Sequence, residues 1–235
     1  MTWSIKTRQL ASYCSFLGLT IILTIGAYFL LRPGWVYYRQ GENYFFAKNF
    51  QQAIVLYQKS IKAGLNRPQI MAHLGDAYMA TGQFHQAMQV FEGILAHDPN
   101  HKGAIRNLAG LYDQFGRLDE AIGLYSKNQH VWSTDLASLL HYVELITRQK
   151  NFTLAQTLVR QALQQHPQNI SLQIKLAEIL SMEKQYDQAI DLYTNILKKY
   201  PENRLARLQL ARVLSWQGRF EEARVEYRKI LGEAK

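Results

Sequence analysis

Residues 68–101 read PQIMAHLGDAYMATGQFHQAMQVFEGILAHDPNH, and this stretch holds the pattern that decides the fold. Ala87 lies three residues after the bulky Phe84 and four residues before the bulky Phe91. The same bulky–alanine–bulky pattern recurs every 34 residues without an insertion or deletion. The central alanines are Ala53, Ala87, Ala121, Ala155, Ala189 and Ala223. A period of 34 is typical of stacked helical hairpins, because one hairpin buries its apolar face only against its neighbours.

With each alanine numbered position 20, the repeats begin at residues 34, 68, 102, 136, 170 and 204. The pattern predicts two amphipathic helices in each repeat, separated by a turn near position 15. That position is glycine at Gly82, Gly116 and Gly218, where a left-handed backbone would end the first helix. Position 8 is Gly or Ala in five of the six repeats, and we expect the two helices to approach closely there.

Seven residues of the second repeat carry a known signature: Met71, Leu74, Gly75, Tyr78, Ala87, Phe91 and Pro99. This pattern resembles the tetratricopeptide repeat family, and the resemblance covers residues 34–235. It implies an all-α fold, a right-handed superhelical solenoid of antiparallel helix pairs.

The residues before the repeats predict a membrane anchor. No charged residue occurs in the 23 residues between Arg8 and Arg32, QLASYCSFLGLTIILTIGAYFLL. As a helix this run is about 34 Å long, enough to cross a bilayer core of about 30 Å. The run is too long for a secretory signal peptide, and it lacks a small-residue cleavage site. We therefore expect residues 1–33 to form a basic tail and a single transmembrane helix, with membrane contact through residues 10–31.

The orientation of this anchor is left open by the charges, because Lys and Arg flank it nearly equally on both sides. A short basic tail before a long apolar segment is typical of an uncleaved signal anchor. We expect a bacterial inner-membrane protein with its repeats in the periplasm, and cytoplasmic repeats are the alternative. Residues 1–67 carry eight Lys or Arg against one acid, which suits a segment beside a membrane.

The junction between the third and fourth repeats departs from the pattern. Asn128 and Ser133 replace a small residue and a proline, and Trp132 lies in the turn between them. Two interpretations follow: either the superhelix changes its pitch at this junction, or Trp132 is partly exposed for a partner. We favour the first.

The sequence contains no motif of an enzyme or a metal site. Among seven histidines, His97 and His101 are separated by a turn sequence, Asp98–Pro99–Asn100, and we expect all seven to be surface residues. HExxH, G-x-S-x-G and Gly-rich phosphate-loop motifs are absent, and Cys14 is the only cysteine. We predict no catalysis, no cofactor and no bound metal.

The resemblance also implies a concave groove lined by positions 2, 5, 9, 12 and 13 of the first helices. In this sequence the candidate partner-binding residues are Tyr38, Glu42, Phe45, Asp76, Met79, Arg106, Asp113, Glu144, Arg148, Glu178, Met182, Arg212 and Trp216. One branch of the family grips a chaperone's terminal carboxylate with Lys at position 5 and Asn at position 9. Neither residue occupies those positions here, so we do not expect that ligand.

These features predict a membrane-anchored scaffold that holds protein partners in a membrane-associated assembly, of the bacterial envelope biogenesis or exopolysaccharide synthesis and export class. The alternative is a non-catalytic regulatory subunit of a membrane enzyme complex, such as a polysaccharide synthase or the cytochrome maturation machinery. Polysaccharide is kept as a further candidate partner because Trp and Tyr are candidate groove residues. Nucleic acid is not expected, because Lys and Arg gather at the two ends of the chain and the groove contains acids.

Overall fold

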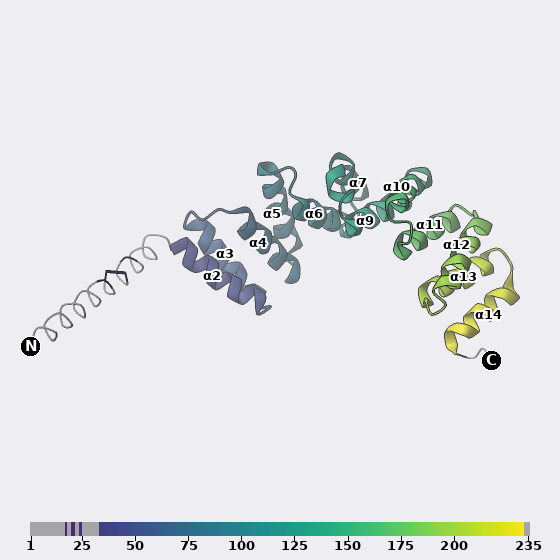
Figure 1. The fold of residues 1–235 in the computed structure, drawn as a ribbon. Helices are drawn as coiled ribbons and strands as arrows, with labels where there is room; N and C mark the ends of the chain where they lie inside the picture. Colours follow the sequence, from purple (N-terminus) through teal and green to yellow (C-terminus); the bar gives the residue numbers. More distant parts are fainter. Residues whose placement is uncertain (1–16, 18–19, 22–23, 25–32, 233–235) are drawn as a thin grey trace, which may run out of the picture. The chain divides into compact units, whose positions relative to one another are not determined.

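The computed structural model describes residues 17, 20, 21, 24 and 33–232, and in this part of the chain the regular elements are helices (Figure 1). The helices from residue 33 onward are α2 (Pro33–Phe46), α3 (Phe50–Lys62), α4 (Pro68–Ala80), α5 (Phe84–His97), α6 (Lys102–Gln114), α7 (Leu118–Lys127), α8 (Gln129–Trp132), α9 (Leu136–Arg148), α10 (Phe152–Gln165), α11 (Ile170–Met182), α12 (Tyr186–Lys199), α13 (Arg204–Trp216) and α14 (Phe220–Leu231). The predicted all-α fold is confirmed for these residues.

The predicted transmembrane helix at residues 10–31 lies outside the described residues, apart from Leu17, Thr20, Ile21 and Thr24. Among the described residues, no helix has the length and apolar character needed to cross a bilayer.

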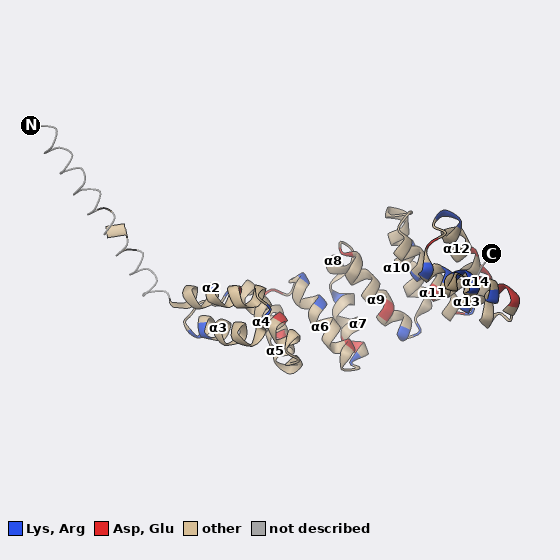
Figure 2. Cartoon of the chain, turned by 90° about the horizontal axis from the view of Figure 1, so that it is seen from below, with Lys and Arg blue, Asp and Glu red and all other residues tan. Residues whose placement is uncertain are grey.

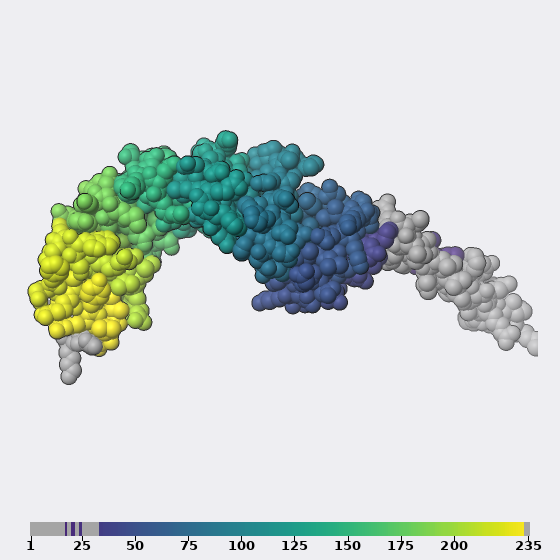
Figure 3. Space-filling model, turned by 180° about the vertical axis from the view of Figure 1, so that it is seen from behind, coloured from purple at the N-terminus to yellow at the C-terminus, as the bar shows by residue number. Residues whose placement is uncertain are grey.

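The chain forms two compact units, Met1–Leu111 and Tyr112–Lys235, with the boundary inside α6. In the first unit α2 packs on α3, α3 on α4 and α4 on α5. In the second unit the contacts follow the same order from α9 through α14. In Figure 3, where colour follows the residue number, neighbouring parts of the second unit pass from teal through green to yellow, as expected when each helix packs on the next. Each unit is built by stacking helices against their neighbours in the sequence.

The repeated alanines lie in the core of these stacks. All six are buried, and the aromatic side chains four residues later are buried at Tyr57, Phe91, Tyr125 and Tyr193. The small residues at position 8 make room for these rings. A Cβ atom added to Gly41 would lie 2.8 Å from a ring carbon of Tyr57, and one added to Gly75 would lie 2.7 Å from a ring carbon of Phe91. The predicted close approach of the paired helices is confirmed at these two glycines.

The turn near position 15 has the same backbone conformation in every hairpin. Its φ angle is positive at Gly82, Gly116 and Gly218, and also at the non-glycine residues Lys48, Lys150 and Lys184. In the first hairpin the backbone N–H groups of Lys48 and Asn49 donate to the carbonyls of Phe45 and Tyr44, at 2.9 and 2.8 Å. These bonds satisfy carbonyl groups that the end of a helix leaves unpaired.

The junction after the third alanine differs from the others in its helices. α7 has only 10 residues and ends at Lys127, and the 4-residue helix α8 follows it. The side-chain amide of Asn128 donates to the Leu124 carbonyl at 2.8 Å and so competes with continuation of the helix. The indole of Trp132 donates to the Tyr125 carbonyl at 3.1 Å, and its ring lies 5.6 Å from that of Tyr142. Trp132 is thus half-buried by packing within the second unit.

Candidate partner-binding site

Three polar contacts with the same spacing join the first helices of successive hairpins. His73 Nδ1 lies 2.7 Å from Glu42 Oε1, and the Asn107 side-chain amide donates to Asp76 at 2.7 Å. Lys175 Nζ donates to Glu144 at 2.8 Å. In each contact the two residues are 31 positions apart, because position 6 of one repeat meets position 9 of the repeat before it. We name these three contacts the first-helix ladder.

The first contact of the ladder belongs to a cluster of rings in the first unit. The hydroxyl of Tyr57 donates to Glu42 at 2.5 Å. Burial, together with this hydrogen bond, raises the pKa of Tyr57 well above its usual value, so the hydroxyl keeps its proton and remains a donor. Phe45 stacks on His73 with the ring centroids 4.9 Å apart, and the ring of Tyr38 lies 6.5 Å from that of Tyr57. Glu42, Phe45 and Tyr38, three of the predicted groove residues, therefore lie in one cluster, and each is half-exposed.

The other predicted residues of the first unit differ in exposure. Asp76 is half-buried, and burial raises the pKa of its carboxyl in spite of the nearby positive groups and the hydrogen bond from Asn107. Met79 is half-buried on α4, whereas Arg106 is exposed on α6. In the first unit, the acids at position 9, Glu42 and Asp76, thus bind side chains of the next hairpin.

Histidines are part of this polar network, which corrects one prediction. The sequence predicts surface positions for His73 and His141, but both are half-buried and hydrogen-bonded. His141 Nδ1 lies 3.0 Å from the Tyr125 hydroxyl, and its Nε2 lies 3.6 Å from a carboxylate oxygen of Asp113. Asp113 also accepts a hydrogen bond from Arg148. Within the described residues, no three His, Cys, Asp or Glu side chains gather in a group suited to a metal ion.

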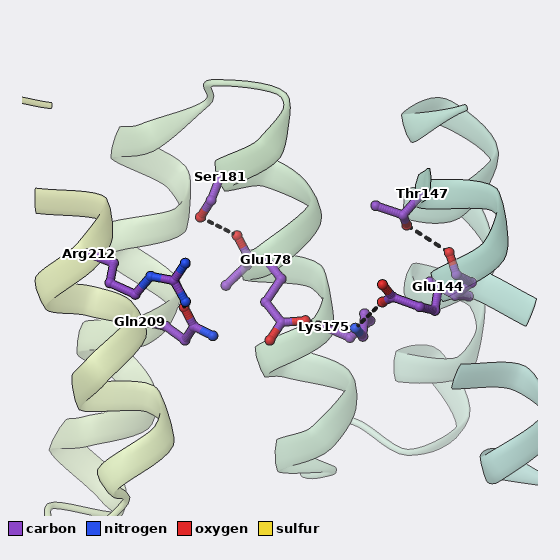
Figure 4. A network of polar contacts seen from close by, with 9 residues as sticks. Glu144, Thr147, Lys175, Glu178, Ser181, Gln209 and Arg212 are labelled. Atoms are coloured by element: carbon purple, nitrogen blue, oxygen red, sulfur yellow. Dashed lines mark hydrogen bonds and ion pairs between the residues drawn. The ribbon is translucent and has the colours of Figure 1, made fainter. Parts of the chain in front are cut away.

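A pocket of about 280 Å³ lies between the first helices of the second unit. Figure 4 shows Lys175 between Glu144 and Glu178, with Gln209 and Arg212 extending from α13. Lys175 Nζ binds Glu144 at 2.8 Å and Glu178 at 2.7 Å. Burial alone would lower the pKa of Lys175, but these two carboxylates outweigh it and hold the pKa above its usual value. The pocket lining also includes Ser181, Met182, Tyr193, Val213 and Trp216.

Five predicted groove residues therefore meet at one place: Glu144, Glu178, Met182, Arg212 and Trp216. Met182 is 52% exposed and Trp216 is 51% exposed, which is high for large apolar side chains. The Arg212 guanidinium carbon lies 5.4 Å from the centroid of the Trp216 ring, a cation–π distance. Acidic and basic residues both occur along the helices of this unit (Figure 2).

Four residues of this pocket lie outside the predicted groove positions, namely Lys175, Tyr193, Gln209 and Val213. Lys175 and Gln209 both occupy position 6, as do His73, Asn107 and His141. A comparison of position 6 with position 9 of the preceding repeat would have revealed acid–base and acid–amide pairs at a constant 31-residue offset.

Comparison with known proteins finds a sequence profile described as the tetratricopeptide repeat, which matches residues 45–100, 80–127, 147–189 and 180–235. Photosystem I assembly protein Ycf3 of Synechococcus sp. (strain CC9311) is 22% identical over 112 residues, which cover 43% of this chain and 65% of that protein. Ycf3 of Prochlorococcus marinus (strain MIT 9303) is 25% identical over 112 residues, with the same coverage. The chain thus spans about 65% of the length of these curated relatives.

Solved structures share the fold at low sequence identity. A tetratricopeptide repeat protein from Parabacteroides merdae superimposes with a TM-score of 0.75 at 13% identity, covering 86% of this chain and 80% of that one. PilF of Pseudomonas aeruginosa superimposes with a TM-score of 0.60 at 17% identity, covering 84% of this chain and 91% of that one. These similarities support a helical solenoid fold for this chain.

Proposed function

Because the chain belongs to the tetratricopeptide repeat family, we propose that it is a non-catalytic, membrane-anchored scaffold whose six hairpins hold protein partners in an assembly. Helical repeats of this type offer an extended surface to partners and place no reactive group there by themselves. The proposal combines that surface with an anchor through residues 10–31, supported by the 23 uncharged residues between Arg8 and Arg32.

The observation that carries the proposal is the pocket of the second unit. Trp216 and Met182 are half-exposed beside Arg212, on two first helices that follow one another in the stack. Aromatic and arginine side chains at the rim of a pocket are typical anchors of protein interfaces. The acids and lysine of the same pocket give it polar groups that fix the orientation of a bound segment.

The type of assembly is suggested by the relatives. Ycf3 proteins are described as assembly proteins of photosystem I, and they align with 43% of this chain. We propose an assembly role of the same general kind at the membrane, in envelope biogenesis or in exopolysaccharide synthesis and export. A non-catalytic regulatory subunit of a membrane enzyme complex, such as a polysaccharide synthase or the cytochrome maturation machinery, is the second candidate, supported by the same anchor and pocket.

The side of the membrane is part of the proposal. The uncleaved signal anchor favours repeats in the periplasm of a bacterial inner membrane. A fusion of alkaline phosphatase after Lys235 is expected to be active, because that enzyme requires an oxidising compartment. An inactive phosphatase with an active cytoplasmic reporter at the same site would place the repeats on the other side.

Crosslinking in intact membranes tests the scaffold itself. A photoreactive phenylalanine derivative at Trp216, which keeps an aromatic ring at this position, should give protein adducts that mass spectrometry identifies, because this side chain is exposed at the pocket. The same amino acid at Arg160, an exposed residue of α10 outside the pocket, is the matched control. Equal adducts from both positions, or none from Trp216, would contradict binding through this surface. Adducts to glycan alone would favour the polysaccharide interpretation.

A further inference from the structure

The first-helix ladder has no contact between α6 and α9, where position 9 is Gly110, and none between α11 and α13, where both of its positions carry polar side chains. By the 31-residue offset, Glu178 would meet Gln209 as Glu144 meets Lys175. Glu178 instead binds Lys175 on its own helix, and Gln209 accepts a hydrogen bond from Arg212 at 3.4 Å. Both residues are described, and no hydrogen bond joins them. The pocket of about 280 Å³ lies at this interruption.

The charges in this pocket are unequally satisfied. Both carboxylates, Glu144 and Glu178, are bound to Lys175. The guanidinium of Arg212 has no carboxylate partner among the described residues, although Arg148 and Arg207 of the same unit each bind one. A guanidinium offers two parallel N–H donors that match the geometry of a carboxylate. Arg212 is therefore the group in this pocket with unused capacity to bind an anion.

The apolar part of the pocket lies next to this cation. The guanidinium lies over the ring of Trp216, and Met182 is exposed on the neighbouring first helix. Pockets for small molecules usually enclose about 300–1,000 Å³, so this one is at or below the lower limit. Its size suits one or two side chains of a peptide better than a cofactor.

We propose that this pocket binds a partner segment carrying an Asp or Glu close to a bulky apolar residue, a specificity that rests on the scaffold function proposed above. The carboxylate binds Arg212, and the apolar side chain covers Trp216 and Met182. A basic segment is disfavoured because it would compete with Lys175 for carboxylates that are already paired. Because both carboxylates are paired with Lys175 and Arg212 has no carboxylate partner among the described residues, the pocket favours an acidic segment.

The probe for this proposal is a library of random 12-residue peptides displayed on phage, selected on the full chain in detergent. The selected peptides are expected to be enriched in Asp or Glu within two residues of Phe, Trp, Leu or Met. Their binding, measured by fluorescence anisotropy with synthetic peptides, should weaken as NaCl is raised from about 50 to 500 mM, because salt screens exposed charges.

Two variants assign this binding to the pocket. Arg212→Gln and Trp216→Ala should each lower the affinity for the selected peptides roughly tenfold or more, because charge-assisted hydrogen bonds and aromatic anchors dominate such contacts. Arg212→Lys keeps the charge without the planar pair of donors, and it should restore only part of the affinity. Arg224→Gln is the matched control, since Arg224 is an exposed arginine of α14 that pairs with Glu221 outside the pocket.

Several results would overturn the proposal. These are selected peptides without acidic residues, basic peptides that depend on Glu144 or Glu178, equal binding to wild type and Arg212→Gln, or a library that yields no binder. The scaffold function has a separate readout. If the Trp216 photocrosslinker captures proteins while the peptide selection fails, the specificity is wrong and the scaffold function stands. If that crosslinker captures no protein, the scaffold function fails at this surface whatever the peptides show.

Discussion

At the scale of single residues, the same substitution has opposite effects at two glycines of one hairpin. Gly75→Ala would place a Cβ atom 2.7 Å from ring carbons of the buried Phe91. We expect a loss of about 1–3 kcal/mol in the free energy of unfolding, because the packed ring has no room to move. Urea unfolding followed by circular dichroism measures this loss.

The control is Gly93→Ala on the opposite helix. An added Cβ there meets no atom within 4 Å, so the variant should gain about 0.5–1 kcal/mol from the better helix propensity of alanine. Equal effects at the two glycines would mean that α4 and α5 do not pack as described.

The half-buried carboxyl of Asp76 is expected to make the stability of the fold depend on pH. Burial raises its pKa, so the folded chain holds the proton more tightly than the unfolded chain. This carboxyl therefore favours folding at low pH and opposes folding increasingly as the pH rises above its ordinary pKa. Asp76→Asn removes the charge and keeps an oxygen that accepts from Asn107.

The Tm of Asp76→Asn relative to wild type should therefore be higher at pH 7 than at pH 4. Thermal melts at the two pH values test this difference. If the Tm of Asp76→Asn minus that of wild type stays constant or falls as the pH rises, the positive groups near Asp76 outweigh the cost of its burial.

The chemistry of the pocket residues was predictable only in part from the sequence. The family's groove positions identify Glu144, Glu178, Met182, Arg212 and Trp216, because the side of a helix on which a residue lies follows from its number in the repeat. The partner of each charge was not predictable in the same way. Whether Lys175 or Arg212 neutralises Glu178 depends on rotamers and on the distance between neighbouring helices.

At the scale of elements, the helices and turns follow closely from the repeat pattern. Buried alanines and aromatic rings require one helix pair in each 34-residue interval, and the observed turns lie at position 15. The exception is the split between α7 and α8. The sequence marks this junction through Asn128 and Trp132, but the hydrogen bonds that end α7 involve backbone groups that no pattern of side-chain types displays.

The turns provide a test at this scale. Gly82 has a φ of 73°, and a Cβ added there meets no atom within 4 Å. Gly82→Ala should therefore cost about 1–2 kcal/mol of stability through the backbone alone, because the left-handed region is unfavourable for alanine. Gly93→Ala, with equal space but a helical backbone, separates this effect from packing. A neutral Gly82→Ala in chemical denaturation would mean that the turn adopts another conformation.

At the scale of the whole molecule, helices that pack on one another are adjacent or nearly adjacent in the chain. Stability in such a stack is the sum of terms for each hairpin and for its immediate interfaces. A local defect should therefore stay local. In Gly75→Ala, native-state hydrogen exchange should accelerate in α4 and α5 and remain near the wild-type rate in α11 to α14.

The experiment compares exchange of backbone amides by mass spectrometry, under conditions in which both proteins remain folded. The wild-type protein at the same pH and temperature is the reference. Uniform acceleration from α2 to α14 would indicate one cooperative unit, contrary to the division of the chain near Leu111.

The first-helix ladder limits how this chain can change length in evolution. Each of its contacts requires an offset of 31 residues, from position 9 of one repeat to position 6 of the next. Insertion of one residue into a first helix, before the residue at position 6, would rotate that residue by about 100° about the helix axis and bring a different side chain to the acid. Duplication or loss of a complete 34-residue unit keeps position 9 of each repeat and position 6 of the next at this offset. Viable length variants of this protein are therefore expected to differ by whole hairpins, so that its reach changes in fixed steps.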